Sequence, residues 1–335
     1  MLARTDLTQA QAKATMEALL GGASPAQIAA FLVLLRAKGE TGPEVAGLAE
    51  AMLATGVPVP AGPGVLDIVG TGGDGIGSVN ISTGATVIAA AAGGRVAKHG
   101  NRSVSSLCGS ADVVEALGVP LDLGPAGILA CLDAAGIAFM YAPVFHPAIA
   151  AVGPVRKALK VRTAFNILGP LLNPARAQFA LVGVYSPSIA PLMASALGAL
   201  GVERALVVHS AGLDELTPMA PALVIEAAGG VAGTPYELDP ARLGIRRCEV
   251  ADLAGGDAAL NASILRDAFG GARSAVADAL NLNAGVALAA AGLAPTPEDG
   301  VALAQETQRA GKAGATLAAW VAAAKQAAAV GATAA

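Results

Sequence analysis

The chain has 335 residues, of which 54% are hydrophobic, 14% are charged and 3% are aromatic. This length and apolar content suit one large domain or two modest ones with a sizeable core, and they exclude an intrinsically disordered protein. The formal net charge of −4 argues against a general nucleic-acid-binding protein, so any phosphate site must be local.

Cysteine spacing and the N-terminal sequence indicate a reduced compartment. Cys108, Cys131 and Cys248 are odd in number, far apart and without metal-ligand spacing. The N-terminus lacks a basic stretch followed by an apolar run, so no signal peptide is predicted. The most apolar windows, near 84–94 and 284–294, are interrupted by glycine and too short to cross a bilayer. We therefore expect a cytoplasmic protein without membrane contact.

The first 60 residues predict three helices. Each predicted start has the capping-box pattern of Ser or Thr followed three residues later by Glu or Gln: Thr8 with Gln11, Ser24 with Gln27, and Thr41 with Glu44. Glycines stand where the helices should end, at Gly21, Gly39 and Gly56. Three successive helices with short connections form a small bundle. The Pro/Gly-rich segment 57–64 then predicts a domain boundary.

After residue 64, short apolar runs alternate with Ala-rich helical stretches. The runs span 65–69, 94–100, 137–143, 178–185 and 204–209. This alternation predicts an α/β domain with a central, mostly parallel sheet flanked by helices. From about Thr296, one or two Ala-rich helices are expected, with a frayed tail after Val330.

The first loop of the predicted α/β domain is rich in glycine. Residues 70–75, GTGGDG, follow the strand 65–69 and contain GxGxxG, so a dinucleotide site is one interpretation and a tight turn another. A dinucleotide site needs an acidic residue about 20 positions further on, and no Asp or Glu occurs between Asp74 and Asp112. Four glycines in six residues favour a loop whose backbone closely approaches a phosphate.

A small polar cluster, NIST at 80–83, separates this loop from the apolar helix predicted at 85–92. Asn or Ser at this position can serve simply as an N-cap. Because the glycine loop comes directly before it, the same helix N-terminus can also bind an anion, and the two roles are compatible.

The second loop, KHGNRSVSS at 98–106, follows the next predicted strand. It should therefore lie beside the first loop, at the carboxyl edge of the sheet. Its two cations and several hydroxyl groups form a phosphate-binding composition, although a solvated run of surface charge is the alternative. Ser110 then begins a further helix, where it could act only as an N-cap.

An adjacent acidic pair, Asp214 and Glu215, follows the strand predicted at 204–209. Taken alone, such a pair is usually a surface feature. Facing two phosphate loops, it suits Mg²⁺, which prefers one or two carboxylates, water and substrate phosphates to a cage made of protein alone.

Together these motifs resemble anthranilate phosphoribosyltransferases. The strings that carry the resemblance are GTGGDG, NIST, KHGNRSVSS with GSAD, FNILGPLLNP at 165–174 and GLDE at 212–215, and QIAAFLVLLRAKGET at 27–41 is also similar. Leu172 departs from the family, which more often has Thr there. The implied fold is a helical domain of residues 1–62 plus about 155–177, and an α/β domain of residues 63–154 and 178–335 that binds phosphoribosyl pyrophosphate (PRPP). The helical domain implies a homodimer.

The resemblance assigns roles residue by residue. For PRPP it implies contacts from Gly70, Gly73, Asp74, Ser78, Asn80, Ser82, Thr83, Lys98, His99, Gly100, Asn101, Arg102, Ser103, Val104, Ser105, Ser106 and Ser110. For anthranilate it implies Gly70, Asn101 and Arg156, and for the cofactor Mg²⁺ it implies Ser82, Asp214 and Glu215. Lys98, Asp214 and Glu215 are the residues implied for catalysis.

The implied activity is transfer of 5-phosphoribosyl from PRPP to the amine of anthranilate, a step of tryptophan biosynthesis. A pyrimidine nucleoside phosphorylase-like enzyme on the same fold is the main alternative, and GTGGDG with KHGNR fits it less well. A non-enzymatic relative that binds nucleic acid is disfavoured by the acidic charge and the intact Asp214–Glu215 pair. A scaffold protein without a ligand would not need the charge contrast among these loops.

Overall fold

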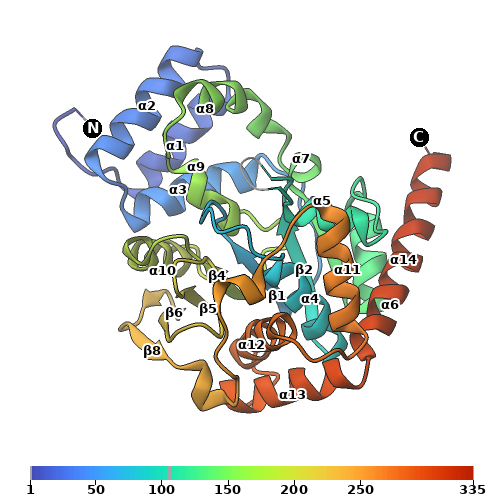
Figure 1. The fold of residues 1–335 in the computed structure, drawn as a ribbon. Coiled ribbons are helices and arrows are strands. Elements are labelled where there is room, and N and C mark those ends of the chain that lie inside the picture. The colour runs from blue at the N-terminus through green and yellow to red at the C-terminus, as the bar shows by residue number, and fades with distance from the viewer. Residues whose placement is uncertain (1, 104–106, 335) are drawn as a thin grey trace.

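A central sheet separates two apolar clusters in the computed structural model of the protein, which describes residues 2–103 and 107–334 (Figure 1). The sheet order is β3-β2-β1-β4-β5-β6-β7, with β8 pairing with β6. The strands are β1 Val65–Gly70, β2 Arg95–Gly100, β3 Ile137–Tyr141, β4 Phe179–Gly183, β5 Arg204–His209, β6 Ala222–Ala228, β7 Val231–Ala232 and β8 Tyr236–Leu238.

The five predicted strands are confirmed, and all of them are parallel. Their neighbours in the sheet pair in the order β3, β2, β1, β4 and β5. The sheet then continues through antiparallel β6, β7 and β8, which were not predicted. Because β2 and β4 flank β1, the direction of chain progression reverses between β1 and β4. In open α/β sheets the carboxyl ends of strands at such a reversal border the ligand crevice.

The predicted N-terminal helices are α1 Gln9–Leu20, α2 Pro25–Lys38 and α3 Gly42–Ala54. The reciprocal capping boxes form as predicted: Thr8 pairs with Gln11 and Ser24 with Gln27, and the Glu44 carboxylate accepts from the Thr41 backbone. Helix α3 ends at Ala54 with Thr55 as its C-cap, one residue before the predicted Gly56.

The remaining helices lie on both faces of the sheet. They are α4 Ile81–Ala91, α5 Ser110–Ala116, α6 Pro125–Ala135, α7 Ala142–Phe145, α8 Gly153–Leu159, α9 Phe165–Leu168, α10 Ala190–Ala199, α11 Ala258–Phe269, α12 Ala275–Ala290, α13 Pro297–Arg309 and α14 Lys312–Ala334. Short 3₁₀ turns span Pro147–Ala151, Gly169–Leu171, Pro187–Ile189, Pro240–Leu243 and Val250–Leu253. Helix α14 continues past Val330, where fraying was predicted.

Alternation along the strands assigns each cluster to one face of the sheet. On β4, Leu181 joins the cluster around α4, α6 and α12, whereas Ala180 and Val182 join the cluster that contains α1–α3 and α10. The second cluster also includes Val155 on α8 and Phe165 on α9. Figure 1 shows α8 beside α1 and α2, at one end of the molecule. In the part of the chain that the structure describes, no helix is long and apolar enough to cross a membrane.

Candidate active site

Two glycines make room for the loop that carries Asp214 and Glu215, which we call the acidic loop. They lie at the ends of β1 and β4, between which the direction of chain progression through the sheet reverses. Gly70 ends β1 and Gly183 ends β4, and the two are register partners. A Cβ atom on Gly70 would lie 2.3 Å from Asp214 Oδ2, and one on Gly183 would lie 1.6 Å from the Asp214 carbonyl oxygen. Asp214 therefore crosses directly over the ends of β1 and β4, where a ligand crevice is expected.

Replacing Gly183 with Ala should displace the acidic loop. The new methyl group meets backbone atoms, which cannot rotate away, so we expect a loss of stability of about 1–3 kcal/mol from overpacking. Activity should fall at least about 100-fold, the scale of losing an oriented charge at a reacting centre. Gly124→Ala is the matched control, because a Cβ there has no neighbour within 4 Å. Equal effects of the two variants in steady-state assays and urea unfolding would reject this explanation.

A tight turn carries the acidic pair from β5 to this position. Ala211 and Gly212 have φ values of 51° and 86°, and Leu213 N–H donates to the Ser210 carbonyl at 2.9 Å. The hydroxyls of Ser210 and Thr217 lie 2.9 Å apart and close the base of the loop. The turn is therefore held at both ends before any ligand is considered.

Each carboxylate of the pair contacts one of the phosphate-type loops. Gly72 N–H, in the glycine loop, donates to Asp214 Oδ2 at 2.5 Å. Ser82 N–H, in the first turn of α4, donates to Glu215 Oε1 at 3.0 Å. The structure thus brings together Gly70, Ser82, Asp214 and Glu215, which the sequence placed in three separate segments.

Electrostatics make this pair suited to a cation. Burial raises the pKa of Asp214 above its usual range, and the carboxylate of Asp74 raises it further. Burial also raises the pKa of Glu215, with Asp214 as the next cause. A bound cation would offset both costs. The oxygen donors fit Mg²⁺, and the described residues hold no cluster of three or more His, Cys, Asp or Glu that could form a full cage.

Lys98 lies beneath this centre and is only 2% exposed. Its ammonium donates to the Ile68 carbonyl oxygen and, at 3.3 Å, to Ser82 Oγ. Burial lowers the pKa of Lys98, while the nearby carboxylates of Asp67, Glu215 and Asp214 oppose that shift. The lysine was predicted to meet a phosphate directly. Its hydrogen bond to Ser82 places the ammonium beside the first turn of α4.

A buried asparagine completes the network around Lys98. Asn173 Nδ2 donates to Asp67 Oδ2 at 2.7 Å and to the Ala97 carbonyl oxygen at 2.8 Å. Burial raises the pKa of Asp67 to about 6, against the lowering effect of Lys98 and Asn173. The network therefore ties β1 and β2 to the segment that follows α9.

The first turn of α4 borders the same centre. Asn80 is its N-cap residue, and Asn80 Oδ1 accepts from Asn261 Nδ2 of α11 at 2.9 Å. Ser78 pairs in a β-bridge with Ala254, so the segment that contains Ala254 supports the loop before α4. Thr83 is 2% exposed. Since the first N–H groups of a helix have no partners within it, this turn can bind an anion.

The second loop leaves β2 beside the first. Gly100 makes room for Ser110, because a Cβ atom on it would lie 2.4 Å from Ser110 Oγ. Ser110 Oγ donates to the Asn101 carbonyl oxygen at 3.2 Å. Asp112 Oδ2 accepts from Ser103 N–H at 3.1 Å. Val104, Ser105 and Ser106, which were also predicted to bind PRPP, lie outside the described residues.

Arg102 is held by acidic groups of the adjoining helix α5. Its Nη1 lies 2.8 Å from Asp112 Oδ1 and 2.9 Å from Glu115 Oε2. The side chain of Arg102 is 43% exposed. The predicted phosphate contact therefore requires Arg102 to leave these carboxylates, or to bind the phosphate while it keeps them.

His99 is neutral and points to the segment after α9. Its Nδ1 lies 3.1 Å from the Gly169 carbonyl oxygen, so Nδ1 carries the proton. Burial, followed by the neighbouring His146, lowers the pKa of His99 to about 3. The ring of His146 lies 5.2 Å from that of His99, and its Nε2 donates to the carbonyl oxygen of Leu172, the residue that departs from the family pattern.

The two arginines near α8 have different surroundings. The Arg156 guanidinium lies 5.2 Å from the centre of the Phe165 ring, and among the described residues no carboxylate is within ion-pair distance of it. Arg162 Nη2 donates to the Gly73 carbonyl oxygen at 2.6 Å, and its guanidinium lies 3.8 Å from the centre of the Tyr185 ring. Arg162 thus links the segment after α8 to the glycine loop.

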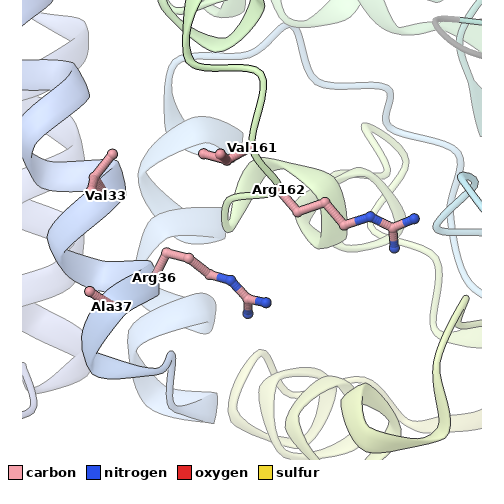
Figure 2. Close-up of a pocket in the computed structure, with 5 residues that line it drawn as sticks. All are labelled: Val33, Arg36, Ala37, Val161 and Arg162. Carbon is pink, nitrogen blue, oxygen red and sulfur yellow. The ribbon is translucent and has the colours of Figure 1, made fainter.

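A cavity of about 470 Å³ lies between α2 and this segment, lined by Val33, Arg36, Ala37, Val161 and Arg162. In Figure 2 the two valines face each other, and both arginines extend to the same side. Arg162 is the residue that joins this cavity to the glycine loop.

Several contributors to the site were not predicted from the sequence. They are Asp67, Arg162, Asn173, Gly183, Asn261 and Asn283. Asn283 donates to and accepts from the backbone of Leu216, directly after Glu215. A usable signal existed for one of them: the string NLNAG interrupts an otherwise apolar helix. Buried polar side chains in such a helix need partners, although the sequence does not name them.

The pairing of a helical bundle with an α/β domain of this design defines a class of glycosyl transferases. Residues 1–56 match the family model described as "Glycosyl transferase family, helical bundle domain". Residues 62–314 match the model of the "a/b domain" of the same family.

Curated relatives narrow this class. The chain is 45% identical over 324 residues to anthranilate phosphoribosyltransferase from Chlamydia caviae, covering 96% of this chain and 94% of that protein. It is 49% identical over 311 residues to the enzyme from a Roseiflexus species, covering 92% of this chain and 91% of the relative. The chain therefore belongs to the anthranilate phosphoribosyltransferase family.

Solved structures agree with this assignment. The fold matches anthranilate phosphoribosyltransferase from Thermus thermophilus with a TM-score of 0.92 at 43% identity, covering 96% of this chain and 97% of the other. It matches the Saccharomyces cerevisiae enzyme, solved in complex with PRPP and Mg, with a TM-score of 0.88 at 25% identity, covering 96% and 94%.

Proposed function

We propose that this protein transfers the 5-phosphoribosyl group of PRPP to the amine of anthranilate, releasing pyrophosphate. The observation that carries the proposal is the acidic pair Asp214–Glu215, which crosses the paired glycines at the sheet reversal and touches both the glycine loop and the first turn of α4. This arrangement suits a polyanionic leaving group with a metal ion. Family membership supports the same reaction.

Asp214, Glu215 and Ser82 are the residues proposed to hold Mg²⁺. When bound there, the ion would neutralise charge that develops on the departing pyrophosphate. The glycine loop and the first turn of α4 would hold the diphosphate through backbone N–H groups. Asp74, Ser78, Asn80 and Thr83 are proposed to line this region.

The protein's own contribution to the chemistry is charge placement and alignment. The buried ammonium of Lys98 donates to Ser82 Oγ, so it would favour negative charge at the proposed pyrophosphate site, and Lys98 remains a proposed PRPP contact. The loop from His99 to Ser110 would enclose the ribose and its 5-phosphate. Holding both substrates at the sheet edge converts their encounter into an effectively unimolecular step. The neutral amine of anthranilate attacks the anomeric carbon of the ribose.

Continuous fluorescence of anthranilate tests the proposal. With PRPP and Mg²⁺ together, the signal should fall, and equimolar pyrophosphate should appear. Omission of either should abolish the change. Two rivals are tested in parallel: thymidine with phosphate should give no free thymine, and single-stranded DNA should not shift the thermal midpoint. Thymidine phosphorolysis without anthranilate consumption would overturn the proposal.

Arg156→Ala tests the proposed amine site. Anthranilate has one carboxylate, and a planar guanidinium can pair with it through two hydrogen bonds. The lack of an acidic partner among the described residues leaves Arg156 available for that contact. We expect KM for anthranilate to rise about tenfold or more, the scale of one lost charge-assisted hydrogen bond, while PRPP binding stays nearly unchanged.

Two comparisons separate recognition from structure. With the same variant, KM for aniline, which has no carboxylate, should rise much less than KM for anthranilate. Lys157→Ala, a change of the exposed cation that follows Arg156, should leave both substrates unaffected. Equal penalties for anthranilate and aniline in Arg156→Ala would mean that this arginine has a structural role only.

The proposal extends to organisation and location. Residues 1–62 with about 155–177 are proposed to form the helical domain, in line with the shared apolar cluster of α1–α3, α8 and α9. A homodimer through this domain is proposed from the family resemblance, and a cytoplasmic location is proposed from the three widely separated cysteines. Sedimentation velocity checks the first, with a monomer at micromolar concentration as the contrary result.

A further inference from the structure

Helix α12 reaches the acidic loop through the side chain of Asn283. Asn283 Oδ1 accepts from Leu216 N–H at 3.1 Å, and Asn283 Nδ2 donates to the Leu216 carbonyl oxygen at 2.7 Å. The same Nδ2 donates to the Ala279 carbonyl oxygen at 2.9 Å. One amide therefore satisfies both polar backbone groups of the residue that directly follows Glu215.

This contact lies in the dry interior. Asn283 and Leu216 are both 0% exposed, so water cannot replace either hydrogen bond at Leu216. Buried backbone groups without partners are costly, which makes any other position of Leu216 unfavourable. Since Leu216 is covalently joined to Glu215, its position limits where that carboxylate can lie.

Helix α12 itself has little freedom to move. A Cβ atom on Gly285 would lie 2.4 Å from the Val301 Cα, so α12 and α13 touch backbone to backbone. On the other side, a Cβ atom on Gly84 of α4 would lie 2.6 Å from Leu280 Cδ2 of α12. Helix α12, which anchors Leu216 through Asn283, therefore also packs against α4. The first turn of α4 contains Ser82.

We propose that Asn283 is a positioning residue for the carboxylate pair Asp214–Glu215. It anchors the chain after Glu215, which keeps Asp214 at the glycine loop and Glu215 at Ser82, where the two carboxylates would hold Mg²⁺. The inference rests on the proposed function for the identity of the ligand. It concerns a residue that touches neither substrate nor metal and acts only through the backbone of Leu216.

The same helix offers a matched control. Asn281 is 2% exposed and lies two residues before Asn283, yet its Oδ1 has no hydrogen-bond partner among the described residues. Leucine has the same branching at Cγ as asparagine, with two methyl groups in place of the amide oxygen and nitrogen. Asn281→Leu and Asn283→Leu therefore make similar changes at neighbouring buried positions, and only the second removes the contact with the acidic loop.

Calorimetric titration with Mg²⁺ and inorganic pyrophosphate gives the direct measurement. We expect Asn283→Leu to weaken binding of the Mg²⁺–pyrophosphate pair at least about tenfold, the scale of one misplaced charge-assisted contact. Asn281→Leu should bind within about twofold of the wild type. In steady-state assays, the Mg²⁺ concentration for half-maximal rate should rise in Asn283→Leu alone, while KM for anthranilate stays within about twofold of the wild type.

The outcomes separate this inference from the proposed reaction. A wild type that binds Mg²⁺–pyrophosphate but transfers nothing to anthranilate refutes the reaction and leaves the binding comparison valid. Equal Mg²⁺–pyrophosphate affinity in the two leucine variants would overturn the positioning role. If Asn283→Leu does not fold, Asn283→Ala replaces it, since the vacated space can admit a water molecule. Failure of both Asn283 variants to fold, with Asn281→Leu folded, would assign Asn283 to stability and also overturn the role.

Discussion

Replacing Asp214 with Asn and Glu215 with Gln is expected to lower phosphoribosyl transfer by roughly a thousandfold or more, the scale of losing oriented charge at the leaving group. Both amides retain an oxygen that can accept from Gly72 N–H and Ser82 N–H, so the loop should keep its shape. A large excess of Mg²⁺ should restore part of the rate. Initial rates over a Mg²⁺ series give the measurement.

The double variant should lose activity without losing stability. Burial raises the pKa of both carboxyl groups, and a neighbouring carboxylate raises each further, Asp74 for Asp214 and Asp214 for Glu215, so in the folded protein the ionised forms are disfavoured. A carboxyl group with a raised pKa costs stability as the pH rises through that pKa, and the neutral amides remove this cost. The thermal midpoint of the metal-free double variant should therefore equal or exceed that of the wild type at pH 7.

A second acidic pair provides the control for this experiment. Glu298 and Asp299 are adjacent and exposed in the first turn of α13. The same two amide substitutions there should leave activity within about twofold. Wild-type activity in the Asp214–Glu215 variant, or undiminished wild-type activity in EDTA, would eliminate the metal role.

Lys98→Met should weaken PRPP binding and destabilise the fold. Loss of charge-assisted support for the phosphate site is worth about 1.5–3 kcal/mol, or roughly 10- to 150-fold in PRPP affinity. Because Lys98 is the buried counter-charge of Asp67, its removal should also cost about 3–5 kcal/mol of unfolding free energy. Calorimetry with PRPP and urea unfolding measure the two effects.

The pH dependence of this variant follows from Asp67. Burial already raises the pKa of Asp67 to about 6, and Lys98 opposes that rise. Without the lysine the pKa goes higher still, so ionisation of Asp67 costs stability over a range that extends above pH 6. The stability deficit of Lys98→Met should widen between pH 6 and pH 8. Exposed Lys312→Met serves as the control, and equal deficits at the two pH values would show that Asp67 and Lys98 are not coupled.

Local signals in the sequence were sufficient for the helices and the parallel strands. The capping pairs Thr8–Gln11 and Ser24–Gln27 were readable because both partners lie within one turn of the same helix. Strands β1 to β5 were readable because strands buried on both faces are largely apolar runs, although β2 also contains Arg95, Lys98 and His99. The short strands β7 and β8 were missed: most of their side chains are exposed, and their pairing depends on β6.

The sequence by itself determined which loops come together at one edge of the sheet. In a parallel α/β sheet the carboxyl ends of all strands lie at one edge, so GTGGDG, KHGNRS and the Asp214–Glu215 pair had to be near one another. Whether Arg162 or Arg156 would face the glycine loop could not be known from the sequence. The two guanidinium groups lie over different rings, those of Tyr185 and Phe165, and only the fold places these rings.

Only the tertiary structure decided how these groups meet. The register that sets Gly70 beside Gly183 leaves space for Asp214, and this register comes from strand pairing over more than a hundred intervening residues. Asn173, Asn261 and Asn283 each hold a loop from a distant segment. In the sequence the first two look like any other asparagine, and the string NLNAG marks Asn283 without naming its partner. A buried amide acquires its role from the backbone groups that folding places opposite it, and those partners are fixed by packing rather than by neighbouring residues in the chain.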